Sequence, residues 1–492
     1  MPVPAKGPDG GCVLINEDVL LTSETRLTAM STTEDGVSPP EDPLGRRGLP
    51  PKVSLLRSKL SQKAKQQPRF RFYALYDRIY RPDVLRAAYQ CVRKEKTAPG
   101  VDGVTFVALE RSPGGVDAFL DELHQSLRSK TYKPAAVRRV EIPKPDGRMR
   151  PLGIPTIRDR VVQMATLLVV EPIFEADFRD SSYGFRPGRS AYDALDAIRD
   201  QLGQGRREVY DADLQGYFDT IPHDKLLKAL AARISDRSVL RLFRMWLQSP
   251  IEQTDARGKR TRQRPAAGTP QGGVISPLLA NVYLHWFEVL FYRADGPGRW
   301  ADARLVRYAD DFVVLARRQT AALHEWIEQT LEKRFGLTIN RSKTKVVRLG
   351  PHGPGLDFLG FTMQYRRSRY AGHGSYLHVG TSSKALQRVR EKLRKLTEVS
   401  RCHKPAPAVI AEVNQLLTGW SSYFGYGHPA ESFHRINFFT YERLRRHLRR
   451  RSQRGYRPPA DRSFYAHLAI LGAKWLGNGR PTASASSTKR LR

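Results

Sequence analysis

Two adjacent aspartates lie in an apolar stretch that the sequence pattern predicts to be a β-hairpin over residues 304–316. They are Asp310 and Asp311 of the motif Tyr308-Ala309-Asp310-Asp311. Like charges this close raise each other's pKa unless a cation is present. A pair of Mg²⁺ ions, bound by carboxylates and substrate phosphates, would supply that cation. An acidic hairpin tip exposed to water is the alternative interpretation.

A further acidic position ends a strand that we expect over residues 208–214. Asp213 lies there, and Asp211 shares its face because successive residues of a strand point to opposite sides. A strand-end acid and a hairpin acid can converge on one metal pair, which stabilises an attacking 3′-oxygen and a leaving pyrophosphate together. Spacing alone does not separate Asp211 from Asp213, and either also fits an ordinary strand-end carboxylate.

A glycine-rich segment lies between these acidic positions in the sequence. Gly272 and Gly273 follow Gln271, and glycines there allow a flat substrate to approach the backbone closely. Pro277 then opens an expected helix. Taken by itself, the segment also fits a plain turn.

The elements expected around these positions alternate between strands and helices, which predicts an α+β fold through about residue 365. The expected elements are hairpin arms at 137–142 and 150–154, helices at 157–178 and 190–203 with Ser190 as N-cap, and a helix from about 70 to 93 with a break at Pro82. Beyond about residue 365, three apolar stripes with interleaved basic residues predict a basic helical region.

The overall charge predicts a polyanionic partner. Lys and Arg number 83 against 49 Asp and Glu, a formal net charge of +34. Nucleic acid is the usual partner of such a chain, because its phosphates neutralise the Lys and Arg side chains. The longest apolar run, 161–174, is too short to span a bilayer and contains Gln163 and Glu171. No membrane partner is therefore expected.

The cysteines and the N-terminal sequence predict a cytoplasmic location. Cys12, Cys91 and Cys402 lie far apart and form no CxxC pair, which argues against a zinc ribbon or a disulfide framework. The first residues show no charged region followed by an apolar segment, so no secretory signal is expected.

Taken in order, these segments closely resemble the bacterial group II intron reverse transcriptases, also called maturases. The resemblance extends from about residue 53 to about residue 475. Its motifs are Leu75-Tyr76-Asp77, Pro99-Gly100-Val101-Asp102-Gly103, Ile142-Pro143-Lys144-Pro145-Asp146-Gly147, Arg150-Pro151-Leu152-Gly153-Ile154-Pro155, Tyr183-Gly184-Phe185-Arg186-Pro187, the segment from Pro270 to Asn281, Phe358-Leu359-Gly360-Phe361, and Leu416-Leu417-Thr418-Gly419-Trp420.

The resemblance implies a right-hand polymerase fold. Fingers and a palm with an antiparallel sheet are followed by an α-helical thumb, or maturase domain. The expected divisions are a disordered N-terminal extension over 1–50, fingers and palm over 51–365, the thumb over 366–478, and a flexible basic tail over 479–492.

The resemblance also implies roles for individual residues. Asp213, Asp310 and Asp311 match the family's catalytic acids, the ligands of two Mg²⁺ ions, whereas Asp211 falls outside that pattern. The substrate-binding residues that it implies are Lys144 and Arg150 on the incoming triphosphate, Gln271 in the nucleotide pocket, Phe218 under the sugar, and Lys343 near the triphosphate. For Lys343, an ordinary solvated lysine is the alternative.

The implied function is that of an RNA-directed DNA polymerase encoded by a group II intron. Such a protein binds its intron RNA to assist splicing and copies it into DNA during retrohoming, using an RNA template, a DNA primer or target, and dNTPs. Since no Cys- and His-bearing endonuclease follows the thumb, the resemblance is to endonuclease-lacking members. A polymerase-inactive splicing factor and a reverse transcriptase co-opted for a host or defence role are the alternatives. Target site, priming mode and oligomeric state do not follow from the sequence.

Overall fold

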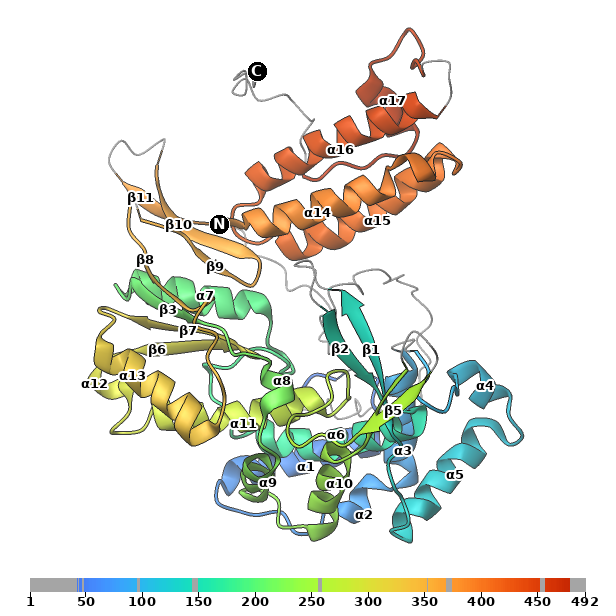
Figure 1. Ribbon diagram of the computed structural model, residues 1–492, viewed down its shortest axis with the longest axis vertical. Coiled ribbons are helices and arrows are strands. Elements are labelled where there is room, and N and C mark those ends of the chain that lie inside the picture. The colour runs from blue at the N-terminus through green and yellow to red at the C-terminus, as the bar shows by residue number, and fades with distance from the viewer. Residues whose placement is uncertain are drawn as a thin grey trace, which may run out of the picture. The chain divides into compact units, whose positions relative to one another are not determined.

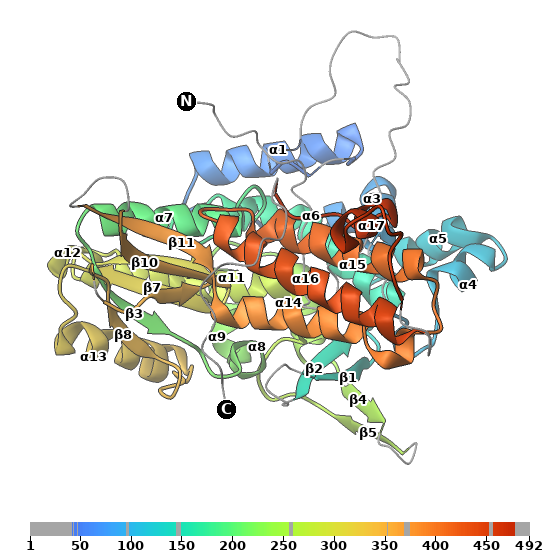
Figure 2. The same cartoon turned by 90° about the horizontal axis from the view of Figure 1, so that it is seen from above.

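The computed structural model describes residues 42, 44–46, 48–94, 98–143, 149–254, 259–351, 353–368, 374–451 and 456–477. The chain divides into two compact units, and the boundary falls between Val346 and Val347. Figures 1 and 2 show their helices and strands. Unit 1 combines antiparallel strands with helices, so the predicted α+β class is confirmed. The assignment of residue ranges to fingers, palm and thumb stays a prediction.

Unit 1 contains thirteen α-helices, eight strands and one π-helical turn among its described residues. They are α1 Pro51–Gln66, α2 Tyr76–Ile79, α3 Pro82–Lys94, α4 Phe106–Arg111, α5 Gly115–Arg128, β1 Val137–Pro143, β2 Met149–Ile154, α6 Ile157–Glu175, α7 Ala191–Gly203, β3 Glu208–Ala212, α8 Tyr217–Thr220, α9 His223–Ala231, α10 Arg237–Leu247, β4 Ile251–Thr254, β5 Arg260–Gln263, α11 Ser276–Phe291, α12 Pro297–Trp300, β6 Arg304–Tyr308, β7 Asp311–Ala316, α13 Ala321–Gln329, η1 Thr330–Phe335 and β8 Lys345–Arg348, which crosses the boundary between the units.

The central sheet has the strand order β6-β7-β3-β8. The expected hairpin over 304–316 is present as β6 and β7, which pair antiparallel. β7 also pairs antiparallel with β3, so that Asp211 faces Val313 and Ala212 faces Phe312. Continuing this register by one residue brings Asp213 opposite Asp311.

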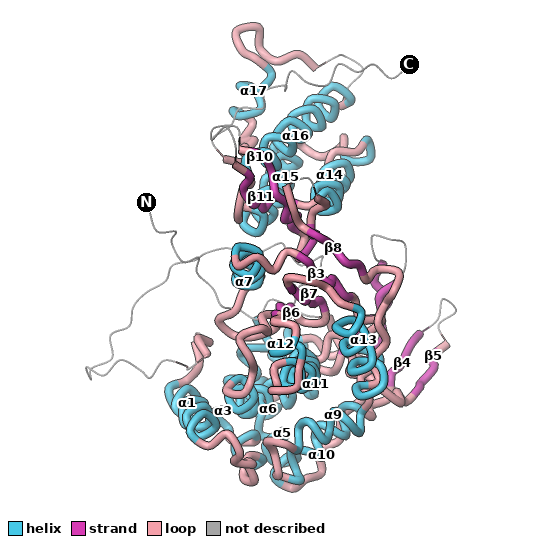
Figure 3. The backbone as a smooth tube through the Cα atoms, turned by 90° about the vertical axis from the view of Figure 1, so that its left-hand side faces the viewer, coloured by secondary structure: helices cyan, strands magenta, loops and turns pink. Residues whose placement is uncertain are grey.

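Helices cover both faces of the central sheet. α7 packs on β6 and β7 from one side, while α11 and α13 lie on the other (Figure 3). The N-cap predicted for α7 is confirmed, because Ser190 and Asp193 form a reciprocal capping box. The alternation of strand side chains explains both layers. Phe312 and Val314 belong to the main core with Phe287 of α11, and Val313 between them lies on the opposite face of the sheet.

The apolar run over 161–174 forms most of α6, the central helix of a bundle with α1 and α3. A second sheet, with the order β2-β1-β4-β5, holds the other predicted hairpin. The helix predicted from about residue 70 begins later than expected. Phe72 instead pairs through its backbone with Arg233 and Ser235, and helix formation starts with α2.

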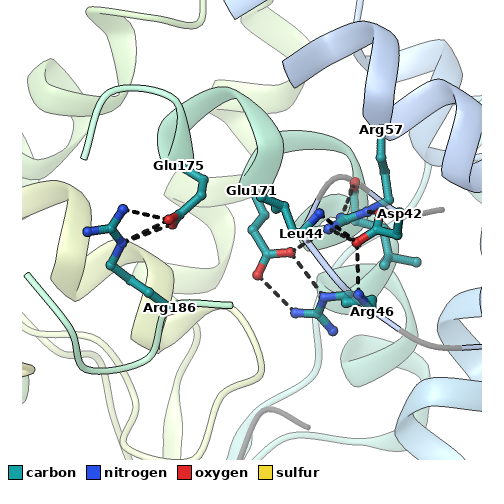
Figure 4. Close-up of polar contacts among 8 residues, drawn as sticks. Asp42, Leu44, Arg46, Arg57, Glu171, Glu175 and Arg186 are labelled. Atoms are coloured by element: carbon teal, nitrogen blue, oxygen red, sulfur yellow. Dashed lines mark hydrogen bonds and ion pairs between the residues drawn. The ribbon is translucent and has the colours of Figure 1, made fainter. Parts of the chain in front are cut away.

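Buried ion pairs fasten the chain before α1 to α6. Arg57 is completely buried and donates to Asp42, to Glu171 at 2.9 Å and to the carbonyl of Leu168 at 2.8 Å, and Arg46 makes two further bonds to Glu171 (Figure 4). Burial raises the pKa of Glu171, but Arg46 and Arg57 more than offset this, so its pKa is lowered. Most of the predicted disordered extension over 1–50 lies outside the described residues, and its described end is anchored here.

Unit 2 consists of a three-stranded sheet followed by helices. Its elements are β9 Leu356–Phe358, β10 Phe361–Arg367, β11 Ser375–Thr381, α14 Ser383–Leu396, η2 Val399–Arg401, α15 Ala406–Phe424, α16 Ala430–Arg450 and α17 Phe464–Ile470. The three apolar stripes predicted beyond residue 365 are the buried faces of α14, α15 and α16. The expectation of helix directly after 365 is wrong, because β10 continues and β11 pairs with it first. The predicted tail over 479–492 lies outside the described residues.

The described helices include none that combines the length and apolar character needed to cross a membrane.

Candidate active site at the end of the central sheet

Asp213, Asp310 and Asp311 come together where β3 and β7 meet. Asp311 begins β7, Asp310 lies in the preceding turn, and Asp213 follows β3 across from Asp311. Residues opposite one another on antiparallel strands have Cβ atoms about 5 Å apart. The three carboxylates that the sequence singled out are thus neighbours.

Burial and repulsion between neighbouring carboxylates raise the pKa values of Asp310 and Asp311. Burial raises the pKa of Asp311 to about 7, with further increases from Asp310, Asp213 and Asp211 in that order. Burial and the charge of Asp213 also raise the pKa of Asp310, while Arg150 and Arg307 lower it. The site therefore concentrates negative charge that a cation would stabilise.

Two side chains from the segment before β8 contact Asp213. Lys343 Nζ lies 3.1 Å from Asp213 Oδ2, and the Asn340 side-chain amide donates to the same oxygen at 2.9 Å. The Asn340 backbone N–H also donates to the Asp213 carbonyl at 2.8 Å. Asp211 has a different cationic neighbour, Lys345, at 3.7 Å. The structure therefore places Lys343 at the acids, and Asn340 is a contact that sequence reasoning missed.

Within the described part of the chain, no group of three or more His, Cys, Asp or Glu side chains is arranged to hold a metal ion. The donor chemistry nevertheless fits a divalent cation, because carboxylate oxygens are hard ligands and the charges of these acids raise the pKa values of Asp310 and Asp311. Oδ2 of Asp213 is instead contacted by Lys343 and Asn340. A metal ion bound through that oxygen would replace the ammonium group of Lys343.

A basic side chain of the β1–β2 hairpin also faces the acids. Arg150 of β2 lowers the pKa of Asp310 by its charge, and its Nε donates to Gln271 Oε1 at 2.9 Å. The Gln271 amide in turn donates to Asp219 at 3.0 Å. Arg150 and Gln271, predicted separately as substrate-binding residues, thus form one chain of contacts. Lys144, the other basic residue predicted there, lies outside the described residues.

The glycine-rich segment packs closely against two neighbouring backbones. Gly272 has a φ of +103°, and a Cβ atom there would lie 2.6 Å from the carbonyl oxygen of Gly153. Gly268, at φ +88°, lies equally close to the backbone of Asp219. Glycine is required at both positions because other residues clash and rarely adopt these angles. The segment therefore holds Gln271 in place beside β2.

Phe218 and Tyr217 lie between the acids and the glycine-rich segment. Tyr217 is 2% exposed, and its hydroxyl donates to the Ala280 carbonyl at 2.6 Å, so it is fixed within the core. Phe218 is 9% exposed and meets the ring of Phe185 edge to face. Its carbonyl accepts from the Thr269 N–H at 2.7 Å, which ties it to the glycine-rich segment.

Arg307, immediately before the acidic motif, is buried beneath it and was missed by sequence reasoning. It is 1% exposed, and its guanidinium donates to Glu288 at 2.6 Å, Asn281 at 2.8 Å and Ser182 at 2.6 Å. It also donates to the Ala309 carbonyl at 2.9 Å. A cation between the apolar Val306 and the acidic motif was the available sequence signal, since buried arginines are found with partners.

The turn that carries Asp310 is held from two sides. Ala309 adopts a left-handed φ of +57°, which costs energy in a residue other than glycine. Gly184 packs so closely that a Cβ atom there would lie 2.3 Å from the Ala309 backbone nitrogen. Asn281 links both sides, because its amide donates to the Gly184 carbonyl at 2.8 Å and its oxygen accepts from Arg307. Arg307 therefore has the geometry of a positioning residue.

For the nucleotide addition that the sequence resemblance implies, we expect Arg307→Lys to lower kcat about 100-fold with little change in KM, because a misplacement of about 1 Å can have that effect. Lysine keeps the charge but cannot donate to four partners in this planar arrangement. Arg206→Lys is the matched control. Arg206 is also buried and pairs with Asp302 at 2.8 Å without contacting the turn. The measurement is kcat and KM of both folded variants by steady-state kinetics. Equal losses of kcat in the two variants would contradict a positioning role for Arg307.

Comparison with known protein families adds two matches. Residues 142–363 match the family model described as reverse transcriptase (RNA-dependent DNA polymerase). Residues 386–463 match the model described as the group II intron, maturase-specific domain. The first match contains the acidic site, and the second covers most of α14 to α16.

Individual relatives agree with these matches. Protein YkfC of Escherichia coli (strain K12) is 36% identical over 354 residues, which cover 65% of this chain and 90% of YkfC. The group II intron-encoded protein LtrA of Lactococcus lactis subsp. cremoris is 37% identical over 215 residues, 44% of this chain and 34% of LtrA. The match therefore spans about a third of the length of LtrA.

Proposed function

The chain belongs to the group II intron reverse transcriptases, which are RNA-directed DNA polymerases with a maturase-specific domain, and from this premise we propose that Asp213, Asp310 and Asp311 are its catalytic acids. The observation that carries the proposal is their convergence at one end of the central sheet. The family generally uses divalent metals. We assign the acids two Mg²⁺ ions, because carboxylate oxygens are suitable ligands.

The basic side chains around the acids have separate proposed roles in nucleotide addition. When bound, two Mg²⁺ ions would stabilise the attacking 3′-oxygen and the leaving pyrophosphate together. Arg150, held by Gln271, presents its guanidinium towards Asp310, where it can bind the triphosphate of an incoming dNTP. With a metal ion held by Asp213, the ammonium group of Lys343 would be available to the same phosphates. Lys144, which lies between β1 and β2 in the sequence, is proposed to bind the same phosphates.

We further propose that unit 2 binds the RNA of the encoding intron, which assists splicing and retains the template for copying during retrohoming. The match to the maturase-specific domain and the basic surface of α14 and α16 support this. An RNA template, a DNA primer or target and dNTPs are the corresponding substrates. Membership of the endonuclease-lacking group and a cytoplasmic location stay predictions.

The direct test of the polymerase is extension of a DNA primer on an RNA template by the purified protein with Mg²⁺ and dNTPs. We expect full-length DNA, and no product once a chelator removes the metal. Absence of extension with Mg²⁺ or Mn²⁺ by a folded protein that still binds intron RNA would instead favour the polymerase-inactive splicing factor.

We predict that Phe218→Ala raises ribonucleotide incorporation relative to deoxyribonucleotide incorporation roughly tenfold or more. Loss of one steric contact in a substrate pocket changes discrimination between two substrates by about this factor. Phe218 lies five residues after Asp213, and its ring would exclude a 2′-hydroxyl by overlap. The buried hydroxyl of Tyr217 argues against Tyr217 in that role. Tyr217→Phe is the control and should leave discrimination unchanged. The measurement is the ratio of kcat/KM for dNTP and rNTP, and an unchanged ratio in active Phe218→Ala would assign Phe218 to the core.

A further inference from the structure

Unit 2 contains a groove of about 320 Å³ whose two walls come from different parts of the chain. One wall is a face of α15, and the other is the segment Lys474–Gly477, which follows α17 and lies outside the matched maturase-specific domain. Small-molecule pockets measure about 300–1,000 Å³, so the groove has room for one nucleotide-sized group.

The α15 wall is polar and built from small side chains. Asn414, Thr418, Ser421 and Ser422 recur at helical spacing along it. Val413 of the same helix is buried in the core of unit 2, and Leu417 belongs both to that core and to the lining of the groove. The Ser421 hydroxyl donates to the Thr418 carbonyl at 3.1 Å. What Ser421 can offer a ligand is therefore an acceptor lone pair, suited to a hydroxyl or amino donor.

The opposite wall is fixed in position by two asparagines. The Asn414 side chain donates to the Gly472 carbonyl at 2.7 Å and accepts from the Lys474 N–H at 2.9 Å. Asn437 makes the same pair of contacts with the backbone of Leu476, both at 2.9 Å. Since both amides bond to the backbone in two directions, the segment is held as a defined wall.

This fixed wall presents an aromatic ring, a cation and an unsatisfied donor. Trp475 stacks on Tyr465 with ring centroids 4.8 Å apart. Its buried Nε1–H has no acceptor among the described residues, and such a donor costs about 1–3 kcal/mol unless a ligand satisfies it. Lys474 is exposed beside it, and no Asp or Glu lines the groove. A ligand with an anionic acceptor therefore fits this wall.

We propose that the groove binds one unstacked nucleotide of a single-stranded RNA segment, a proposal that rests on the RNA-binding function of unit 2. Lys474 is placed for phosphate or base oxygens, and the Trp475 Nε1–H is an unsatisfied donor in the same wall. The hydroxyl-lined face of α15 is placed for the 2′-hydroxyl, the group by which proteins distinguish RNA from DNA. Aromatic side chains and basic grooves are the usual means of binding single strands.

The test fills the groove without changing the charge. Ser421→Phe places a bulky ring in the groove, and Gln415→Phe is the matched control because Gln415 is exposed on α15 and lies outside the groove. The probe is a short oligouridylate with one photoreactive 4-thiouridine, compared with a DNA oligomer of matching sequence. We expect Ser421→Phe to weaken RNA binding about tenfold, the scale of losing one stacked base. Gln415→Phe should bind like the unsubstituted protein.

Cross-linking locates the nucleotide. In the unsubstituted protein the 4-thiouridine should cross-link to the peptide containing Lys474 and Trp475, and Ser421→Phe should abolish that cross-link. Equal RNA affinity of Ser421→Phe and unsubstituted protein would overturn the proposal, as would equal losses in both variants. Competition by free uridine monophosphate as strong as that of the oligomer would assign the groove to a free nucleotide. Failure of the unsubstituted protein to bind RNA would refute the RNA-binding function itself, a distinguishable result.

Discussion

Asp310→Asn should reduce DNA synthesis at least about 1,000-fold, equivalent to about 4 kcal/mol of transition-state stabilisation. The substitution keeps the size of the side chain and removes the charge that we assign to metal binding. Asp310 is partly buried, and its pKa is raised by desolvation and by Asp213. A neutral amide at this position should also lower the pKa of Asp311, because repulsion by Asp310 contributes to raising it.

Asp211→Asn is the matched control for this substitution. Asp211 lies on the same face of the chain as Asp213 and raises the pKa of Asp311, but its cationic neighbour is Lys345. We expect Asp211→Asn to retain most of the activity. Primer extension with single-turnover rates distinguishes the two variants. Loss of activity in Asp211→Asn combined with normal rates in Asp310→Asn would show that the acids have been assigned incorrectly.

RNA affinity should fall steeply with salt, by about 10³- to 10⁵-fold between 50 and 200 mM if 6–10 phosphates are contacted. The basic face responsible includes the end of α16, where Arg449 and Arg450 are exposed. Arg443, in contrast, donates to Thr397 and to the carbonyl of Arg394 and has a structural role. The arginines of α16 are therefore not equivalent.

Replacing both Arg449 and Arg450 with glutamine removes two positive charges. This should reduce the slope of log affinity against log salt concentration by about one for each residue. The matched control neutralises Arg237 and Arg244, two exposed arginines on α10 of unit 1. We expect the control to retain the full slope for intron RNA. A slope unchanged by the α16 substitutions and reduced by the α10 substitutions would move the RNA-binding surface to unit 1.

Local sequence patterns predicted much of the fold because local contacts determine those elements. The Ser190 cap and the apolar spacing of residues 191–202 define α7 within one segment. The hairpin of β6 and β7 follows from two apolar arms around an acidic turn. β11 was missed, although it pairs with β10 along its whole length. That pairing is a contact between segments, which a residue-by-residue pattern does not contain.

In the candidate site, too, residues in short motifs were predicted and residues with distant partners were missed. The acids were found because they lie in short motifs, and the strand register then explains their convergence. Arg307 and Asn340 were missed because their partners lie far away in sequence: Arg307 bonds to Ser182, and Asn340 bonds to Asp213. The anchoring of Asp42 by Arg57 is likewise visible only once α1 is packed on α6.

The main proposal is that one chain carries two separable functions, DNA synthesis at the acids of unit 1 and intron RNA binding through unit 2. It is tested most directly by assaying folded Asp310→Asn for primer extension and for splicing of the encoding intron in the same preparation. We predict that primer extension is lost and that splicing proceeds as with the unsubstituted protein, because RNA binding does not depend on these acids. Loss of both activities in a protein shown to be folded would contradict separable functions, and normal primer extension would contradict the catalytic assignment of Asp310.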